Sequence, residues 1–267
     1  MPMLDWWWAY LALGAFVGFF AGLLGIGGGA AMVPVLAFVY AAKGFDESLV
    51  VHLALGTSLA TMLFTSVSSV YAHHRHGAVN WRVVKRMAPG IIVGTFGGAL
   101  LASALNVRLL TVVFTLLIYY ISAQMLFGRK PRPGAVRSTT AGMNAAAAGI
   151  GMISSLTATG GAALVVAYLV KRDITVHSAI GTAAAIGWPL AAAGTAGYVL
   201  TGIGQQGLPA FSLGYIYGPG LAGIVIASML LAPLGARLAH RTPGATLKKI
   251  FAVVLFVLAT KMLVSFF

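Results

Sequence analysis

The sequence contains no cysteine, and only four of its 267 residues are aspartate or glutamate. The lack of cysteine excludes disulfides, thiolate catalysis and cysteine metal sites. Charged residues make up 8% of the chain, and hydrophobic residues make up 60%. Soluble domains carry about 25% charged and about 45–50% apolar residues, so this composition predicts an integral membrane protein. The apolar runs are long and continuous, which favours an all-α bundle of membrane helices.

The few carboxylates and the missing motifs narrow the function further. Asp5, Asp46, Glu47 and Asp173 all flank apolar segments, which argues against a carboxylate proton relay or a carboxylate sodium site inside the membrane. Backbone carbonyls at a broken helix remain an alternative for holding a cation. The sequence has no GxxxxGK(S/T) loop for ATP and no GxSxG, HExxH or histidine-box motif. We therefore expect no enzyme activity, no metal and no cofactor.

The net charge of +13 comes from basic residues that gather in short loops between the apolar segments. That distribution is typical of membrane topology, because cytoplasmic loops carry an excess of Lys and Arg, and it argues against a nucleic-acid partner. The basic stretches 73–86 and 128–140 are therefore expected in the cytoplasm, and the uncharged loop around Gln205 outside. With these sides fixed, both chain termini are expected outside.

The apolar segments fall into two sets of four: 6–42, 48–72, 87–105, 109–127, then 141–170, 174–203, 213–236 and 250–267. The two sets match in sequence, since Val51-His52 and Gly56-Thr57 recur at the same spacing as Val176-His177 and Gly181-Thr182. The chain is therefore interpreted as an internal duplication. The predicted division is a first transmembrane repeat, a basic cytoplasmic linker and a second transmembrane repeat, at residues 1–127, 128–140 and 141–267.

The loop charges place equivalent loops of the two repeats on opposite sides, which is the inverted-topology repeat of many secondary transporters. Segment 141–170 must then leave and re-enter the same side. Two full crossings need about 40 residues, so we expect a hairpin that enters part-way and bends at 157–161. Segment 6–42 is expected to bend at 25–29, with two short crossings as the alternative. The predicted fold has six full spans plus two broken or re-entrant glycine-tipped hairpins.

The glycine tips of the two hairpins form the first candidate site. Bent backbone inside a bilayer is tolerated where it lines a cavity, and free N–H groups at the start of a half-helix favour an anion. Close helix packing is the alternative explanation of such glycines, and we favour it for Gly97 and Gly98. The candidate substrate-binding residues of the tips are Gly27, Gly28, Gly29, Gly160 and Gly161.

Side chains near the tips extend the candidate set. The hydroxyl candidates are Thr57, Ser58, Thr159 and Thr182. Such hydroxyls either contact the anion or only bond the carbonyl one turn back, and the sequence leaves both alternatives open. His52 and His177 occupy equivalent positions one turn inside their segments. An intramembrane histidine suits a coupled proton or an anion contact, whereas interfacial anchoring is the alternative.

The first hairpin carries a family resemblance, in the string Gly22-Leu23-Leu24-Gly25-Ile26-Gly27-Gly28-Gly29-Ala30-Ala31-Met32-Val33-Pro34-Val35-Leu36. It resembles the opening signature of the sulfite exporter TauE/SafE family, the toluene-sulfonate uptake permeases. Further matches at 55–59, 77–82 and 232–240 extend the resemblance over nearly the whole chain. It implies an inner-membrane transporter of sulfite, sulfonates and related organosulfur anions. Thr159 replaces the first glycine of the triplet in the second repeat, so an anion site need not be symmetric.

These observations rank three classes of function. A secondary transporter of a small anion comes first, a passive anion channel of the same architecture is the alternative, and an intramembrane enzyme is a distant third. The expected location is the bacterial inner membrane. The expected partners are a small anionic substrate and membrane lipid, with a coupling proton and a second copy of the chain as options.

Overall fold

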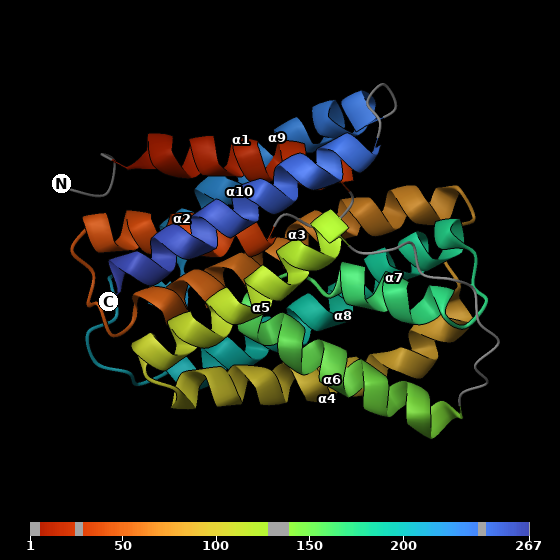
Figure 1. Ribbon diagram of the computed structural model, residues 1–267. Coiled ribbons are helices and arrows are strands. Elements are labelled where there is room, and N and C mark those ends of the chain that lie inside the picture. The colour runs from red at the N-terminus through yellow and green to blue at the C-terminus, as the bar shows by residue number, and fades with distance from the viewer. Residues whose placement is uncertain (1–5, 25–28, 128–138, 240–243, 267) are drawn as a thin grey trace.

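The computed structural model describes residues 6–24, 29–127, 139–239 and 244–266. Within these residues the chain forms ten helices that run along a common direction in an elongated bundle (Figure 1). The first five are α1 (Trp7–Leu24), α2 (Gly29–Ala42), α3 (Val50–Arg75), α4 (Trp81–Ala104) and α5 (Val107–Phe127). The other five are α6 (Thr140–Thr157), α7 (Ala162–Val170), α8 (Val176–Gly202), α9 (Gly218–Ala239) and α10 (Gly244–Ser265). Two short strands, β1 (Ser212–Leu213) and β2 (Ile216–Tyr217), pair antiparallel before α9.

Four of the described helices are long and apolar enough to cross a membrane: α3, α4, α5 and α8. The shortest of them has 21 residues, which at 1.5 Å per residue spans about 30 Å, the thickness of the hydrocarbon core. Shorter apolar helices occur at Trp7–Phe20, Gly29–Ala42 and Gly218–Leu231. The all-α prediction is confirmed for the described residues, and the structure is consistent with an integral membrane protein.

Two helices, α4 and α9, begin at other residues than the predicted segments 87–105 and 213–236 do. Asn80 starts α4 ahead of segment 87–105, because its side chain accepts a hydrogen bond from the N–H of Val83 at 3.2 Å. The apolar pattern missed this start since the first turns of α4 carry Arg82 and Lys85. At the front of segment 213–236 the chain forms the β1–β2 hairpin instead of helix, turning at Gly214 with a φ of +56°.

Segments 6–42 and 141–170 each form two helices rather than one. After α6 ends, Ala158 has a φ of +49°, and Gly160 and Gly161 follow with φ of +71° and +65°. Positive φ costs glycine little because it has no Cβ, so these two glycines allow the tight reversal into α7. Residues 25–28, between α1 and α2, lie outside the described part of the chain.

Helices from the two halves of the chain pack in matching pairs. α1 packs along α9 and α6 along α4, while α3 packs on α8 and α5 on α10. Glycines permit the closest of these approaches. A Cβ on Gly90 or Gly94 of α4 would overlap a carbonyl oxygen of α6, and one on Gly18 of α1 would overlap the backbone of α9.

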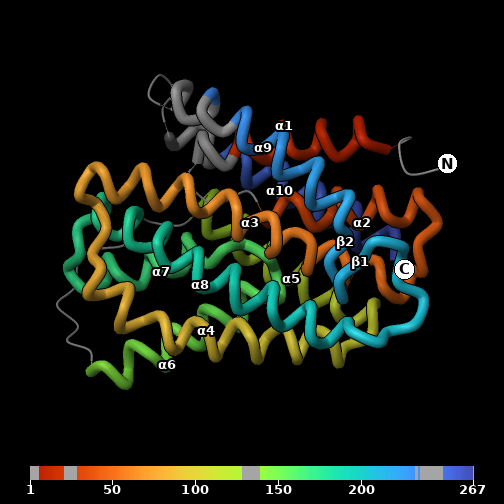
Figure 2. The backbone as a smooth tube through the Cα atoms, turned by 180° about the vertical axis from the view of Figure 1, so that it is seen from behind, coloured from red at the N-terminus to blue at the C-terminus, as the bar shows by residue number. Residues whose placement is uncertain are grey.

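The two broken-helix hairpins open toward opposite ends of the bundle (Figure 1). We call the end where α1 begins and α10 ends the terminal end, and the end where α3 joins α4 the α3–α4 end. The α1–α2 hairpin opens at the terminal end and the α6–α7 hairpin at the α3–α4 end. The view from behind shows the same two ends, with the β1–β2 hairpin at the terminal end (Figure 2).

Candidate functional site

The broken helices meet inside the bundle. Gly29, the first residue of α2, lies against Ala158, the residue that follows α6, and a Cβ on Gly29 would overlap the carbonyl oxygen of Ala158. The Sδ atom of Met62 in α3 lies 3.0 Å from the same Cβ position. This contact is buried, since Ala158 is 0% exposed and the next residue, Thr159, is 8% exposed. Only glycine fits at position 29 without displacing the end of α6.

The start of α7 presents backbone donors to this region. Its N-cap, Gly161, has no side-chain cap. The first N–H groups of a helix have no acceptor within the helix, and the N–H of Val165 is the one that reaches back to the oxygen of Gly161, at 2.8 Å. These amides and the helix dipole give the start of α7 a positive potential. At the other tip, α2 likewise begins with a glycine, Gly29.

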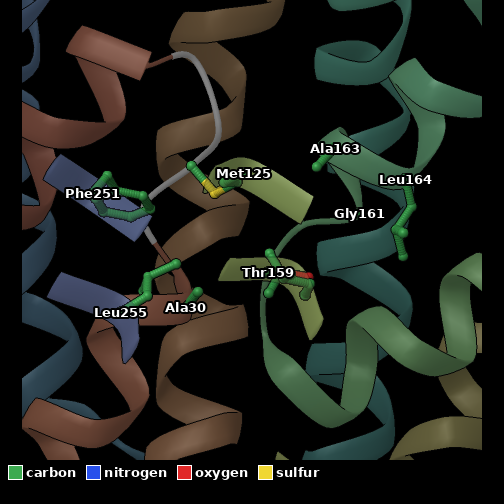
Figure 3. Close-up of a pocket in the computed structure, with 9 residues that line it drawn as sticks. Ala30, Met125, Thr159, Gly161, Ala163, Leu164, Phe251 and Leu255 are labelled. Atoms are coloured by element: carbon green, nitrogen blue, oxygen red, sulfur yellow. The ribbon is translucent and has the colours of Figure 1, made fainter. Parts of the chain in front are cut away.

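A small cavity lies between these helix starts, and Figure 3 shows Thr159 beside it. The cavity is lined by Ala30, Ile121, Met125, Thr159, Gly161, Ala163, Leu164, Phe251 and Leu255. Thr159 supplies the one side-chain hydroxyl of this lining, and the other contributions are apolar side chains and backbone. The volume is about 20 Å³, which is room for about one water molecule.

Hydroxyl groups flank the tip of the α6–α7 hairpin. Thr157 Oγ1 donates to the carbonyl oxygen of Ile153 at 2.9 Å and lies 3.0 Å from Oγ1 of Thr159. Ser58 Oγ is buried and has no hydrogen-bond partner among the described residues. Ser58 lies one turn before Met62 on α3, so it shares the helix face that meets Gly29. Ser58 and Thr159 thus belong to the surroundings of the tips.

Thr57 and Thr182 bond to the opposite half of the chain. Thr57 Oγ1 accepts hydrogen bonds from the backbone N–H of Tyr217 at 3.0 Å and from the hydroxyl of Tyr40 at 3.3 Å. Thr182 Oγ1 accepts one from the backbone N–H of Asn80 at 3.0 Å. Tyr217 directly precedes α9, and Asn80 directly precedes α4. We call these contacts the Thr57 clasp and the Thr182 clasp, because each joins one half of the chain to the start of a helix from the other.

A glycine makes each clasp possible. A Cβ on Gly56 would overlap the carbonyl oxygen of Tyr215, and a Cβ on Gly181 would lie 2.7 Å from the carbonyl oxygen of Ala78. The recurring Gly-Thr pair therefore lets a loop cross the helix closely and then holds it by a hydrogen bond. The sequence revealed the recurrence but not these partners, because the loops lie far away along the chain.

His52 and His177 have different environments although their sequence positions match. His52 is 4% exposed, and its Nε2 lies 3.1 Å from the carbonyl oxygen of Ala102, so Nε2 carries the proton of that hydrogen bond. Its Nδ1 is buried with no hydrogen-bond partner among the described residues, and its ring stacks on that of Tyr215. His177, near the start of α8, is exposed.

The structure therefore brings together only part of the predicted set. The residues that gather at the tips are Gly29, Ser58, Thr159, Gly160 and Gly161. The predicted residues with other neighbours are His52, Thr57, His177 and Thr182. Gly27 and Gly28 lie outside the described residues. The role of all these residues in binding an anion stays a prediction.

Comparison with known proteins decides the family. A family model described as "Sulfite exporter TauE/SafE" matches residues 10–262. The chain belongs to the TauE/SafE family. It is 36% identical over 254 residues to a "Probable membrane transporter protein" of Haemophilus influenzae, which covers 94% of this chain and 96% of that protein. No solved structure matches the chain.

More distant relatives carry similar names. The "Probable membrane transporter protein YdhB" of Bacillus subtilis is 26% identical over 247 residues, covering 87% of this chain and 90% of that protein. MJ0441 of Methanocaldococcus jannaschii, also a "Probable membrane transporter protein", is 24% identical and covers 84% of this chain and 80% of that protein. The TauE/SafE resemblance is thereby confirmed. Together with these relatives, it identifies the chain as a membrane transporter.

Proposed function

We propose that this TauE/SafE protein is a secondary transporter that moves a small sulfur oxyanion, such as sulfite or a sulfonate, across the bacterial inner membrane by alternating access. The observation that carries the proposal is the meeting of two broken helices at Gly29 and Ala158, beside a small cavity that Thr159 lines. Broken helices inside the bundle are where many secondary transporters bind their substrates. The substrate class follows the family description.

Backbone amides supply the donors in this proposal. A small oxyanion in a dry site needs several hydrogen bonds at once, and no lysine or arginine lines the cavity in the described residues. The proposed binding groups are Gly27, Gly28 and Gly29 of the first predicted tip, Thr159, Gly160 and Gly161 just before α7, and the hydroxyl of Ser58. We assign Thr57 and Thr182 to gating instead, since their Oγ1 atoms already accept hydrogen bonds from protein donors.

The arrangement of the helices supports an inverted repeat of residues 1–127 and 141–267. Each helix of the first repeat has a counterpart five helices later, so that α1 corresponds to α6 and α4 to α9. When counterparts are exchanged, the contact of α1 with α9 becomes the contact of α6 with α4, which is also observed. The same exchange maps the contacts of α3 with α8 and of α5 with α10 onto themselves. In addition, the two hairpins open at opposite ends of the bundle (Figure 1). We therefore retain six spans and two re-entrant hairpins as the membrane arrangement.

The two clasps offer a physical basis for alternating access. The Thr57 clasp fastens the start of α9 to α3, and the Thr182 clasp fastens the start of α4 to α8. Because repeat symmetry exchanges these two contacts, releasing one of them opens one side of the bundle while the other side stays closed. Both clasps are formed in this structure, and the cavity at the tips has a volume of about 20 Å³.

A passive anion channel of the same architecture is the second candidate. Flux into proteoliposomes tests both, with sulfite, sulfoacetate, thiosulfate and a small carboxylate as substrates, each with and without a pH gradient. Accumulation of a sulfur oxyanion above its outside concentration supports the transporter. Flux that only equalises the two concentrations supports the channel. Failure of every sulfur oxyanion to cross, by protein that is folded and inserted, contradicts the proposed substrate class.

A further inference from the structure

A lysine and two tyrosines form a cluster at the terminal end that the sequence did not single out. The Nζ atom of Lys43 donates a hydrogen bond to the hydroxyl of Tyr217 at 3.2 Å and lies 5.2 Å from the centre of that ring. It also lies 5.5 Å from the ring centres of Tyr10 and Phe45. Lys43 is half-buried, and in the described residues no carboxylate forms a salt bridge with it.

The hydroxyl of Tyr10 is the second unusual feature of this cluster. Tyr10 is 0% exposed, and its hydroxyl is buried with no hydrogen-bond partner among the described residues. The Cβ of Tyr10 lies 2.8 Å from the Cβ position of Gly223, and its Cε1 lies 3.5 Å from that of Gly220. The ring therefore packs along the first turns of α9, and the hydroxyl of Tyr10 neighbours Tyr217. A buried hydroxyl without a partner is costly, so it calls for an acceptor.

The start of α9 adds a positive potential at the same place. α9 has 22 residues, and the first N–H groups of such a helix have no acceptor within it. Gly218 donates to the carbonyl oxygen of Phe211, and Pro219 has no N–H, which leaves the amide of Gly220 as the first unassigned donor. The nearest acidic side chain in sequence, Asp46, accepts its hydrogen bonds from Ser48. Two positive groups and an unpartnered hydroxyl thus converge on one spot.

We propose that the Lys43 ammonium, the hydroxyls of Tyr10 and Tyr217 and the first turn of α9 form an oxyanion-binding site at the mouth of the terminal end. Ammonium, hydroxyl and helix-start amides are the donors that bind an oxyanion strongly. This site is separate from the hairpin tips and deepens the proposed function, on which it rests, by giving the transported anion a docking point. A lipid phosphate headgroup has the same chemistry and is the alternative source of the ligand.

The Thr57 clasp links this site to gating. The backbone N–H of Tyr217 bonds Thr57, while the hydroxyl of the same residue accepts from Lys43. An anion that draws Lys43 away from Tyr217 therefore acts on the residue that holds the start of α9 to α3. In this way, arrival of the anion is coupled to release of the clasp at the terminal end.

Acetylation of lysines tests the site without depending on transport. The full chain, purified in phosphate-free maltoside detergent, is treated with dilute acetic anhydride, and the modification of Lys43 and Lys261 is followed by mass spectrometry. Lys261 is the matched control, since its Nζ also lies over an aromatic ring, that of Phe38 at 5.7 Å. Methanesulfonate is compared with sodium chloride at equal ionic strength, and phosphatidylglycerol is added in a separate arm.

We expect methanesulfonate to slow acetylation of Lys43 severalfold and to leave Lys261 unchanged. In the Tyr10→Phe variant, which keeps the ring, the half-protecting concentration should rise about tenfold, as expected for one lost hydrogen bond to a charged ligand. Protection by phosphatidylglycerol alone would support the site and assign it to a lipid headgroup. Equal behaviour of Lys43 and Lys261 in both arms would overturn it. If protection is found but proteoliposomes transport no sulfur oxyanion, the proposed function fails and the site stands.

Discussion

Gly29 of α2 and Ala158 after α6 lie so close that a Cβ on the glycine would overlap the carbonyl oxygen of the alanine. The two residues are far apart in the chain and belong to different broken-helix hairpins. Their contact joins the two hairpins, and the starts of α2 and α7 line one cavity.

Removing one clasp at a time should open the bundle from one end at a time. The chain has no cysteine, so Ala30→Cys gives a single reporter that lines the central cavity. Thr57→Val should speed its modification by an impermeant thiol reagent from the terminal end, and Thr182→Val should do so from the α3–α4 end. Thr182→Val removes one hydrogen bond and Thr57→Val removes two, those from Tyr217 and Tyr40. At about 1 kcal/mol for each bond, a change of at least several-fold in rate is expected.

Thr201→Val is the control for the clasp variants, because Oγ1 of Thr201 donates to the carbonyl oxygen of Gly197, one turn back in the same helix, at 2.8 Å. In the Thr201→Val variant, the cysteine at position 30 should react at the same rate as in the protein with both clasps intact. If both clasp variants react equally from the two ends, the clasps are fixed structural contacts and do not gate.

His52 should carry the coupled proton, if coupling uses a histidine. Its Nδ1 is buried with no hydrogen-bond partner within the described part of the chain, so it can take up a proton in a conformation that supplies an acceptor, whereas His177 is exposed. His52→Gln should keep substrate binding measurable while abolishing the dependence of flux on a pH gradient, and His177→Gln should keep that dependence. Proteoliposome flux at matched and opposed pH measures both. Unchanged pH dependence in both variants removes histidine from the mechanism.

The two ends of the bundle should face opposite sides of the membrane. Cysteines placed at the exposed residues Gln206 and His76 report on the terminal end and the α3–α4 end. In intact cells an impermeant maleimide should label the first position but reach the second only after the membrane is opened. Labelling of His76→Cys from outside would contradict the proposed orientation and the placement of both termini outside.

Local sequence patterns were sufficient to predict that the chain is helical and that segment 141–170 is broken. They did not predict where α4 and α9 begin, or which segments contact each other. Apolar length indicates α3 and α8, since a buried span needs apolar side chains on every face. The recurrence of Gly56-Thr57 as Gly181-Thr182 indicates a duplication, yet nothing local predicts that Thr57 meets Tyr217, because that contact is made only when the halves pack.

The lysine and tyrosine cluster was missed for a similar reason. Tyr10, Lys43 and Tyr217 are single aromatic or basic residues in three separate segments, and each alone is typical of a membrane interface. The signal that could have found them is an unpaired basic residue at the end of the first hairpin with no basic neighbour in its loop. The environment of His52 also could not be predicted. Its sequence match with His177 suggested equal surroundings, but His52 is buried and His177 is exposed.

The most direct test of the central claim is the affinity of the purified protein for sulfite and methanesulfonate, measured by calorimetry in the parent, Gly160→Ala and Gly97→Ala. Gly160 has a φ of +71° at the start of α7, where a methyl group costs about 1–2 kcal/mol of backbone strain and obstructs close approach of an anion. A Cβ on Gly97 meets nothing within 4 Å. We predict at least tenfold weaker binding for Gly160→Ala in protein that purifies normally, and parental binding for Gly97→Ala. Parental affinity in both variants would contradict an anion site at the glycine tips.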